Sequence, residues 1–184
     1  LENIAVDSWQ ESQAKKLVDL KIPSGSSCSI IGPHGSGKSK ILNTICGLAT
    51  MEKGEAKIDG IDLHKLDLYS DDNQIMIVNR DQFIAGTLKE NLFLGGDFTA
   101  DEVQQSLDDV CFSDENDEHK TTNLDLEISP NGYPLVTGQL IKLCVARCLL
   151  HKPKVILIDL AFDIVDSETR KLLLSIILDD KQPW

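Results

Sequence analysis

The stretch that decides the fold is GPHGSGKS, residues 32–39. It satisfies the pattern G-x-x-x-x-G-K-[ST] at every fixed position, with a predicted strand before it and a helical pattern after it. Glycines let such a loop turn tightly and bring backbone N–H groups close to phosphate oxygens, and the following helix N-terminus adds partial positive charge. In this pattern Lys38 reaches the terminal phosphates and the Ser39 hydroxyl binds Mg²⁺. The sequence therefore predicts a phosphate-binding loop.

A second stretch supplies a matching metal-site element. The apolar run Val155–Ile158 ends directly in Asp159. The carboxyl end of a buried strand is where α/β sheets bind ligands, and a carboxylate there can hold Mg²⁺ through water. Together the two stretches predict a P-loop nucleotide-binding fold.

Composition and charge narrow the class of protein. The chain has 184 residues and a net charge of −12, from 18 Lys and Arg against 30 Asp and Glu. This length suits one domain, and the negative charge argues against nucleic acid as a partner, because affinity for phosphate backbones depends on cationic side chains. Since the chain begins with Leu1 and has no basic segment ahead of an apolar run, we expect no signal peptide and a longer parent protein.

One segment concentrates the acidic side chains. Residues 95–128 hold 11 Asp and Glu and a single Lys, which indicates a solvated helical region. Its acids do not follow the calcium-loop pattern, so we expect no cation site there. The five cysteines form no C-x-x-C pair and suit a reducing compartment.

Strands and helices alternate along the chain, which predicts an α/β fold with a largely parallel sheet and a separate antiparallel patch near the N-terminus. Thr99, with Glu102 three residues later, is an expected helix cap. The expected strands are residues 4–6, 17–22, 28–31, 74–78 and 155–158, with a hairpin over residues 54–62. The expected helices are residues 38–48, 87–93, 99–111, 139–151 and 167–178.

Further along, the chain resembles the nucleotide-binding domain of ATP-binding cassette (ABC) transporters. The segment LVTGQ (residues 135–139), the stretch LIKLCVARCLLHKP (140–153) and the strand before Asp159 follow the family's signature, helix and Walker B strand in order and spacing. Residues 84–92 and 126–132 are similar to exporter segments, the second to a loop that contacts the membrane domain. Residues 164–166 resemble the family's D-loop.

The resemblance implies an ABC-type ATPase core with an inserted helical subdomain. One domain of residues 1–184 would comprise a core (1–86 and 140–184) and a helical subdomain with the signature (87–139), and its last strands would be truncated. It implies Mg-ATP held in a head-to-tail dimer, with a second nucleotide-binding domain and a transmembrane domain as partners, on the cytoplasmic side of a membrane.

The resemblance also assigns site residues. Trp9 would stack on adenine, and Mg²⁺ would be held by Ser39, Asn79 and Asp159. The nucleotide would be bound by Gly32, His34, Gly35, Ser36, Gly37, Lys38, Ser39 and Lys40 of this chain and by Val136, Thr137, Gly138 and Gln139 at the other site of the dimer.

This chain departs from the family pattern at positions that carry chemistry. Leu160 stands where the family has its catalytic Glu, and Leu can neither accept a proton nor orient water. Val136 replaces the signature Ser, and Thr137 replaces a Gly. Asn79 aligns with the Q-loop Gln, with Gln82 as the alternative register. No His follows His151, so the family's switch His is missing, which we interpret as truncation.

These departures favour an ATP-binding module with impaired hydrolysis, and two alternatives stay open. The first is a fully active ABC ATPase that uses a non-standard base, for which Asp163 is the nearest candidate. The second is a soluble protein that uses ATP as a dimerisation switch. A kinase and a GTPase are disfavoured, because the chain has no acceptor-site motif and no N-K-x-D guanine motif. The transported substrate and the homo- or heterodimeric pairing leave no mark in the sequence.

Trp9 allows a direct test of adenine stacking. We predict that ATP quenches Trp9 fluorescence in a Trp184→Phe background, because base–indole stacking contributes about 1–3 kcal/mol and changes the indole environment. A titration that shows ATP binding without any quench would place the aromatic platform elsewhere.

Overall fold

The computed structural model of the chain describes residues 2–5, 17–18, 20–49, 54–63, 75–113 and 122–184. These residues form two compact units, residues 1–70 and 71–184, which are considered one at a time below. The predicted division into a core (1–86 and 140–184) and a helical subdomain (87–139) remains a prediction.

The first unit contains the antiparallel patch expected near the N-terminus. Strand β1 (Glu2–Ala5) lies between β2 (Leu17–Val18) and β3 (Gly54–Glu55), and both pairings are antiparallel. Strand β1 covers Glu2–Ala5 rather than the expected residues 4–6, and β2 covers only Leu17–Val18, with residues 20–22 outside any strand.

A tight hairpin follows β3, as the sequence predicted. Strands β4 (Lys57–Ile58) and β5 (Ile61–Asp62) pair antiparallel across a two-residue turn. Both turn residues, Asp59 and Gly60, have positive φ angles, of 52° and 79°. An Asp-Gly pair suits this turn because its backbone twist matches that of the flanking strands.

Helix α1 (Lys38–Ile45) begins at the expected residue but ends three residues before the predicted end at residue 48. Gly47 adopts a left-handed conformation (φ 72°), and the Gly47 N–H donates to Thr44 O at 3.1 Å, which closes the helix. Leu48 is consequently exposed instead of extending the apolar face.

The strand predicted at residues 28–31 is wrong for this structure. Those residues are extended coil, and the Ile31 side chain is 92% exposed. A strand exists only when a neighbour pairs with its backbone, and no described strand of the first unit pairs with this segment.

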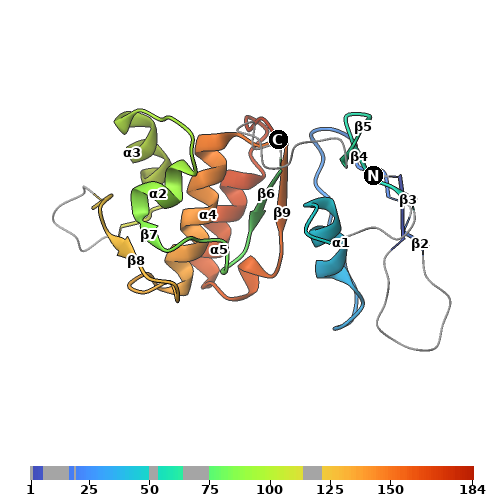
Figure 1. The fold of residues 1–184 in the computed structure, drawn as a ribbon, viewed down its shortest axis with the longest axis horizontal. Coiled ribbons are helices and arrows are strands. Elements are labelled where there is room, and N and C mark those ends of the chain that lie inside the picture. Colours follow the sequence, from blue (N-terminus) through green and yellow to red (C-terminus); the bar gives the residue numbers. More distant parts are fainter. Residues whose placement is uncertain (1, 6–16, 19, 50–53, 64–74, 114–121) are drawn as a thin grey trace. The chain divides into compact units, whose positions relative to one another are not determined.

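The second unit is organised around helix α4 (Thr137–His151). Strands β6 (Ile75–Val78) and β9 (Val155–Ile158) form a parallel pair in which Val78 lies opposite Ile158. Figure 1 shows α4 between this pair of strands and the helices α2 and α3, while α5 (Ser167–Ile177) also packs on α4. The parallel pairing and the bounds of β9 confirm the sequence-based expectation.

Two short helices cover the other side of α4, and each begins with a threonine cap. Helix α2 (Leu88–Phe93) follows the short strand β7 (Gly86–Thr87), which pairs antiparallel with β8 (Glu127–Ile128). Helix α3 (Ala100–Asp109) has the predicted capping box, in which the Thr99 N–H donates to Glu102 at 2.9 Å. These hydrogen bonds satisfy N–H groups that a helix N-terminus otherwise leaves unpaired.

Several helix ends differ from the predictions by one or two residues. Helix α4 begins at Thr137 rather than at residue 139, because the Gln139 side chain accepts the Val136 N–H at 3.1 Å and caps an earlier turn. Helix α3 ends at Asp109 rather than at residue 111, where Cys111 has a left-handed φ of 50°.

The core of the second unit is built from buried aliphatic side chains of all these elements. Helix α4 is buried along most of its length and contributes the most members. The largest fully buried side chains of this unit are Leu88, Leu92, Leu107, Ile128, Ile141, Leu143, Leu173, Val78, Val103, Val110 and Val145.

A charged side chain, Arg147 of α4, lies inside this core with only 4% of its surface exposed. Its guanidinium Nε and Nη1 donate to the carbonyl oxygens of Asn91 and Gln82, and Nη2 donates to Asn91 Oδ1 at 2.6 Å. Burial lowers the pKa of Arg147. The planar fork of an arginine suits this network, because it presents several donors in fixed directions.

The fully buried Asn91 completes the network. Its amide nitrogen donates to the carbonyl oxygens of Ile84 (2.9 Å) and Thr87 (3.0 Å), and its amide oxygen accepts the Ile84 N–H at 2.9 Å. The network therefore ties residues 82–87, which have little regular structure of their own, to two helices.

The network makes a prediction about stability. We expect Arg147→Met to lower the free energy of unfolding by about 2 to 4 kcal/mol, because it leaves buried carbonyl groups without donors. The matched control is Arg80→Met, since Arg80 is 64% exposed and pairs with Asp81 on the surface. That control should change the stability by less than about 0.5 kcal/mol in urea denaturation. Equal losses in the two variants would contradict the prediction.

Candidate functional site: a phosphate loop and a strand-end pair

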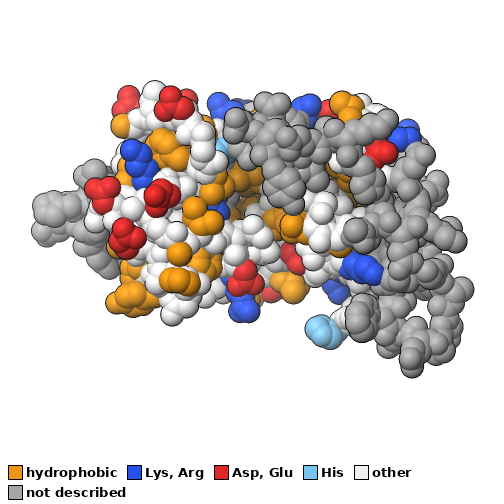
Figure 2. Space-filling model, viewed as in Figure 1, with side chains coloured by type: hydrophobic (Ala, Val, Ile, Leu, Met, Phe, Trp, Pro, Cys, Tyr) orange, Lys and Arg blue, Asp and Glu red, His pale blue; other side chains and the backbone are white. Residues whose placement is uncertain are grey.

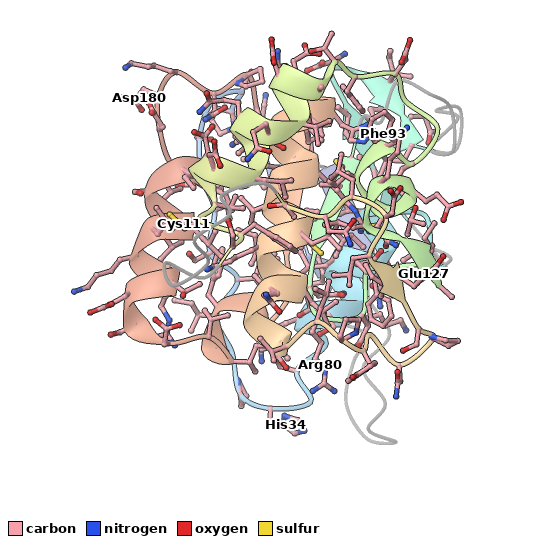
Figure 3. All side chains as sticks on the ribbon, turned by 90° about the vertical axis from the view of Figure 1, so that its left-hand side faces the viewer. His34, Arg80, Phe93, Cys111, Glu127 and Asp180 are labelled. Atoms are coloured by element: carbon pink, nitrogen blue, oxygen red, sulfur yellow. The ribbon has the colours of Figure 1, made fainter. Side chains whose placement is uncertain are left out.

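The predicted phosphate loop is an exposed turn ahead of α1. Gly35 and Gly37 have φ angles of 76° and 93°, which side chains with a Cβ rarely adopt. At Gly32, an added Cβ would lie 2.8 Å from Ser36 Oγ, so a side chain there would require the Ser36 side chain to shift. His34 is exposed on this loop (Figure 3).

The loop lysine folds back on its own loop. Lys38 Nζ donates to the carbonyl oxygens of Gly32 at 2.8 Å and Pro33 at 2.9 Å. The ammonium group is thus already placed above the loop, where anionic oxygens could replace the carbonyl acceptors. Ser39 and Lys40 follow in the first turn of α1, where helix N–H groups favour anions.

In the second unit, two predicted metal ligands lie at one edge. Asn79 follows β6 and Asp159 follows β9, and the Asp159 N–H donates to Val78 O at 3.2 Å. The parallel pairing therefore places both residues at the carboxyl ends of adjacent strands. We refer to Asn79 and Asp159 as the strand-end pair. Ser39, the third predicted ligand, belongs to the first unit.

The Asn79 side chain is oriented by its own turn. Asn79 Oδ1 accepts the Asp81 N–H at 2.9 Å, and Asn79 is half-buried while Arg80 is exposed (Figure 3). This turn brings the chain from β6 to Gln82, the alternative Q-loop position. The backbone carbonyl of Gln82 accepts a hydrogen bond from Arg147.

Leu160, at the predicted position of the catalytic carboxylate, lies directly after Asp159 in a left-handed conformation (φ 54°). Its side chain is 61% exposed rather than packed in the core. The short 3-10 helix Ala161–Asp163 follows and carries the exposed Asp163. An apolar side chain thus points to solvent at the edge where the chemistry was expected.

The signature residues form the N-terminus of α4. Val136 caps the helix and is 65% exposed, and Thr137 to Gln139 form its first turn. A Cβ added at Gly138 would meet no atom within 4 Å. Helix N–H groups at this end are available to an anion from outside the chain.

The D-loop segment has a structural role that sequence reasoning missed. Asp166 Oδ1 accepts the N–H groups of Glu168 (3.0 Å) and Thr169 (2.8 Å) and so caps α5. The hydrogen bonds from Thr169 lower the pKa of the Asp166 carboxyl. An Asp directly before a helical pattern is the sequence signal that could have indicated this cap. Trp9, the predicted adenine platform, lies outside the described residues.

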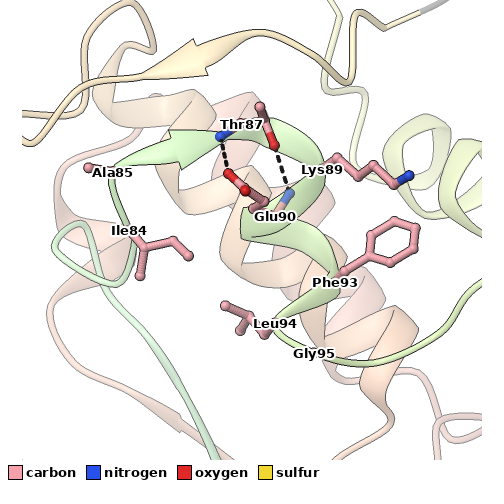
Figure 4. A pocket seen from close by; sticks show the side chains of 8 residues that line it. All are labelled: Ile84, Ala85, Thr87, Lys89, Glu90, Phe93, Leu94 and Gly95. Carbon is pink, nitrogen blue, oxygen red and sulfur yellow. Dashed lines mark hydrogen bonds between the residues drawn. The ribbon is translucent and has the colours of Figure 1, made fainter.

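A shallow groove on the second unit was also missed. It runs along β7 and α2, with Phe93 and Leu94 at one end and the Thr87–Glu90 capping box on its wall (Figure 4). Ile84 and Leu94, which line it, are exposed apolar side chains, and the sequence carries no signal for that exposure. On the face seen in Figure 2, acidic side chains gather over the neighbouring α3. The remaining lining residues are Ala85, Lys89 and Gly95.

Comparisons with known proteins agree with this geometry. The ABC transporter family profile matches residues 16–163. The chain is 34% identical to the "Uncharacterized ABC transporter ATP-binding protein YknV" of Bacillus subtilis, over 91% of the chain and 28% of that protein. It is 31% identical to the "ABC multidrug transporter MDR1" of Cryptococcus neoformans, over 84% of the chain and 11% of that protein.

A solved structure of a bacterial Atm1-family ABC exporter with ATP bound has the same fold, with a TM-score of 0.81 and 23% identity. The match covers 98% of this chain and 32% of that one. The chain belongs to the ABC transporter family, in which it is a nucleotide-binding domain of the P-loop α/β class. Membership implies ATP binding.

The position of Lys38 predicts the effect of removing it. We expect Lys38→Ala to weaken ATP binding about 10- to 100-fold in calorimetry, because a charge-assisted hydrogen bond contributes about 1.5–3 kcal/mol. The control is Lys21→Ala, which removes an exposed positive charge from the same unit outside the loop. If both variants bind ATP as the unaltered chain does, the phosphate-loop assignment is wrong.

Proposed function

We propose that the chain is the ATP-binding module of an exporter-type ABC transporter, and that it holds Mg-ATP while hydrolysing it slowly. The observation that carries the proposal is the contrast at one edge of the second unit. Asp159 is present at the end of β9, whereas the exposed side chain beside it is Leu160. The chain spans 11% and 28% of the two relatives named above, so transport is a proposal about a larger assembly.

The residues present suit a magnesium–nucleotide complex. Mg²⁺ prefers oxygen ligands and keeps several waters, and the proposed ligands are a hydroxyl (Ser39), an amide (Asn79) and a carboxylate (Asp159). The absence of a side chain at Gly32, and the left-handed backbone at Gly35 and Gly37, suit a close approach of phosphate to the backbone of the loop. When bound, the cation would neutralise phosphate charge. Gly32 to Lys40 would then surround the phosphates with N–H groups and the Lys38 ammonium.

The weak point of the proposed site is proton transfer. A positioned general base contributes about 10²- to 10⁴-fold to rate, and the Leu160 side chain supplies none of it. Val136 offers no hydroxyl to a γ-phosphate, and such contacts matter most when charge develops in the transition state. Neither change touches the phosphate loop, so binding would survive while turnover falls.

In a head-to-tail dimer, Leu160 and Val136 of one chain would belong to different nucleotide sites. Leu160 would belong to the site that contains this chain's own phosphate loop, whereas Val136 would face the phosphate loop of the partner. Two copies of this chain would then build two sites with both defects. An intact partner would build one site without the base and one site with a changed signature, so neither would have the full set.

The membrane domain is the second partner in the proposal. The groove along α2 is lined by the half-buried Phe93 and the exposed Leu94, and Lys89 adds a positive charge beside them. It therefore offers a partner both an apolar surface and a charged group. Residues 126–132, which resemble an exporter loop that contacts the membrane domain, include β8, which pairs with β7 of this groove. Among the described residues, no helix has the length and apolar character needed to cross a bilayer. By its resemblance to exporter nucleotide-binding domains, we propose that the module lies on the cytoplasmic face of a membrane and attaches through this groove.

Hydrolysis by the natural full-length protein tests the proposal. We predict a rate well below about 1 s⁻¹, and a gain in the Leu160→Glu, Val136→Ser double variant. The control is Leu178→Glu, which places the same acid at another exposed leucine, 56% exposed at the end of α5.

Unaltered protein that hydrolyses ATP at about 1 s⁻¹ or faster would overturn the slow-turnover proposal. Loss of that activity in Asp163→Asn would then identify Asp163 as the non-standard base. If the double variant gains activity and the Leu178→Glu control does not, the defect lies at Leu160 and Val136.

A further inference from the structure

Two side chains of α4 hold the turn that carries Asn79. Cys144 Sγ lies 3.3 Å from Asn79 O and 3.6 Å from Gln82 O, and Arg147 Nη1 donates to Gln82 O. Cys144 and Arg147 are one helical turn apart and are 3% and 4% exposed. The first and last carbonyl groups of residues 79–82 are therefore fixed by buried donors of a single helix.

The same turn orients the Asn79 side chain. Its amide oxygen accepts the Asp81 N–H at 2.9 Å, inside the segment whose two ends α4 holds. On the other side, the Asp159 N–H donates to Val78 O, which precedes Asn79 directly. The relative position of Asn79 and Asp159 thus depends on a strand pairing on one side and on α4 on the other.

The chemistry of Cys144 suits a fixed donor. Its Sγ is buried and lies within hydrogen-bond distance of two carbonyl oxygens, so its S–H group can donate to one of them. Cys148, one turn further along α4, is equally buried, and no hydrogen bond from it to residues 79–82 is found in the described part of the chain. The two cysteines therefore differ in what they contact rather than in their environment.

We infer that Cys144 and Arg147 are positioning residues for the strand-end pair, and that they make the placement of Asn79 dependent on α4, whose N-terminus carries the signature residues. The inference rests on the proposed function, in which Asn79 and Asp159 contribute to Mg²⁺ binding. Residues that orient a metal ligand typically change metal affinity about 10- to 100-fold when they are altered.

The test measures the Mg²⁺ dependence of ATP binding by the 184-residue chain. Calorimetry gives the ATP affinity in EDTA and over a Mg²⁺ titration for the unaltered chain, Cys144→Ala, Cys144→Ser and Cys148→Ala. We expect Cys144→Ala to raise the Mg²⁺ concentration at half-maximal effect about tenfold, with the affinity in EDTA unchanged. Cys144→Ser keeps a donor and should stay close to the unaltered chain, as should the matched control Cys148→Ala.

Amide hydrogen exchange gives a second readout that needs no nucleotide. Residues 79–82 should exchange faster in Cys144→Ala than in Cys148→Ala. Arg147→Lys, which keeps the charge but loses the planar fork, should shift the Mg²⁺ midpoint in the same direction as Cys144→Ala.

The outcomes separate the two proposals. Equal Mg²⁺ midpoints in Cys144→Ala and Cys148→Ala, with normal Mg-ATP binding by the unaltered chain, would overturn the positioning role alone. An equal shift in Cys144→Ser and Cys144→Ala would also overturn it, because the donor would then be irrelevant. Absence of Mg²⁺-dependent ATP binding in the unaltered chain would overturn the proposed function and the inference together.

Discussion

The second unit depends on one buried guanidinium. Arg147 brings a positive charge into an aliphatic core, and the desolvation that this requires is offset only because carbonyl and amide oxygens converge on its fork. One of those oxygens, Gln82 O, belongs to the irregular segment between β6 and α2, and the other two belong to Asn91 of α2, whose side chain also bonds the Ile84 backbone. The constraint therefore acts in both directions: the segment keeps the cation hydrogen-bonded, and the cation gives the segment a defined conformation.

If the proposed function is correct, that arrangement would let the site retain binding while its chemistry is altered. The strand-end pair is held by strand pairing and by α4, whereas Leu160 and Val136 are exposed at the ends of elements and bear little of the packing. Substitutions at such exposed positions leave the core unchanged. A nucleotide-binding domain can thus lose catalytic groups without losing the framework that places its ligands.

The sequence predicted those parts of the fold whose signal is local. Val155–Ile158, the Thr99 cap and the phosphate loop each show their pattern within a few residues, and the family resemblance was confirmed by comparison. The strand at residues 28–31 failed because a strand needs a partner that no local pattern reveals. The contacts of Arg147 with Asn91 were missed for a related reason, since the two residues are 56 positions apart. Trp9 and the site-residue assignments remain predictions.

Gly138 is a position where the fold of the chain itself does not require glycine. A methyl group there would meet no atom within 4 Å among the described residues outside its own helical turn, and glycine early in a helix costs backbone entropy relative to alanine. Alanine at position 138 would therefore stabilise the isolated domain. A requirement for glycine at this position would then come from another molecule that approaches the first turn of α4, as in the proposed dimer. Tolerance to substitution at this residue, compared between the isolated domain and the assembled protein, separates the requirements of the two states.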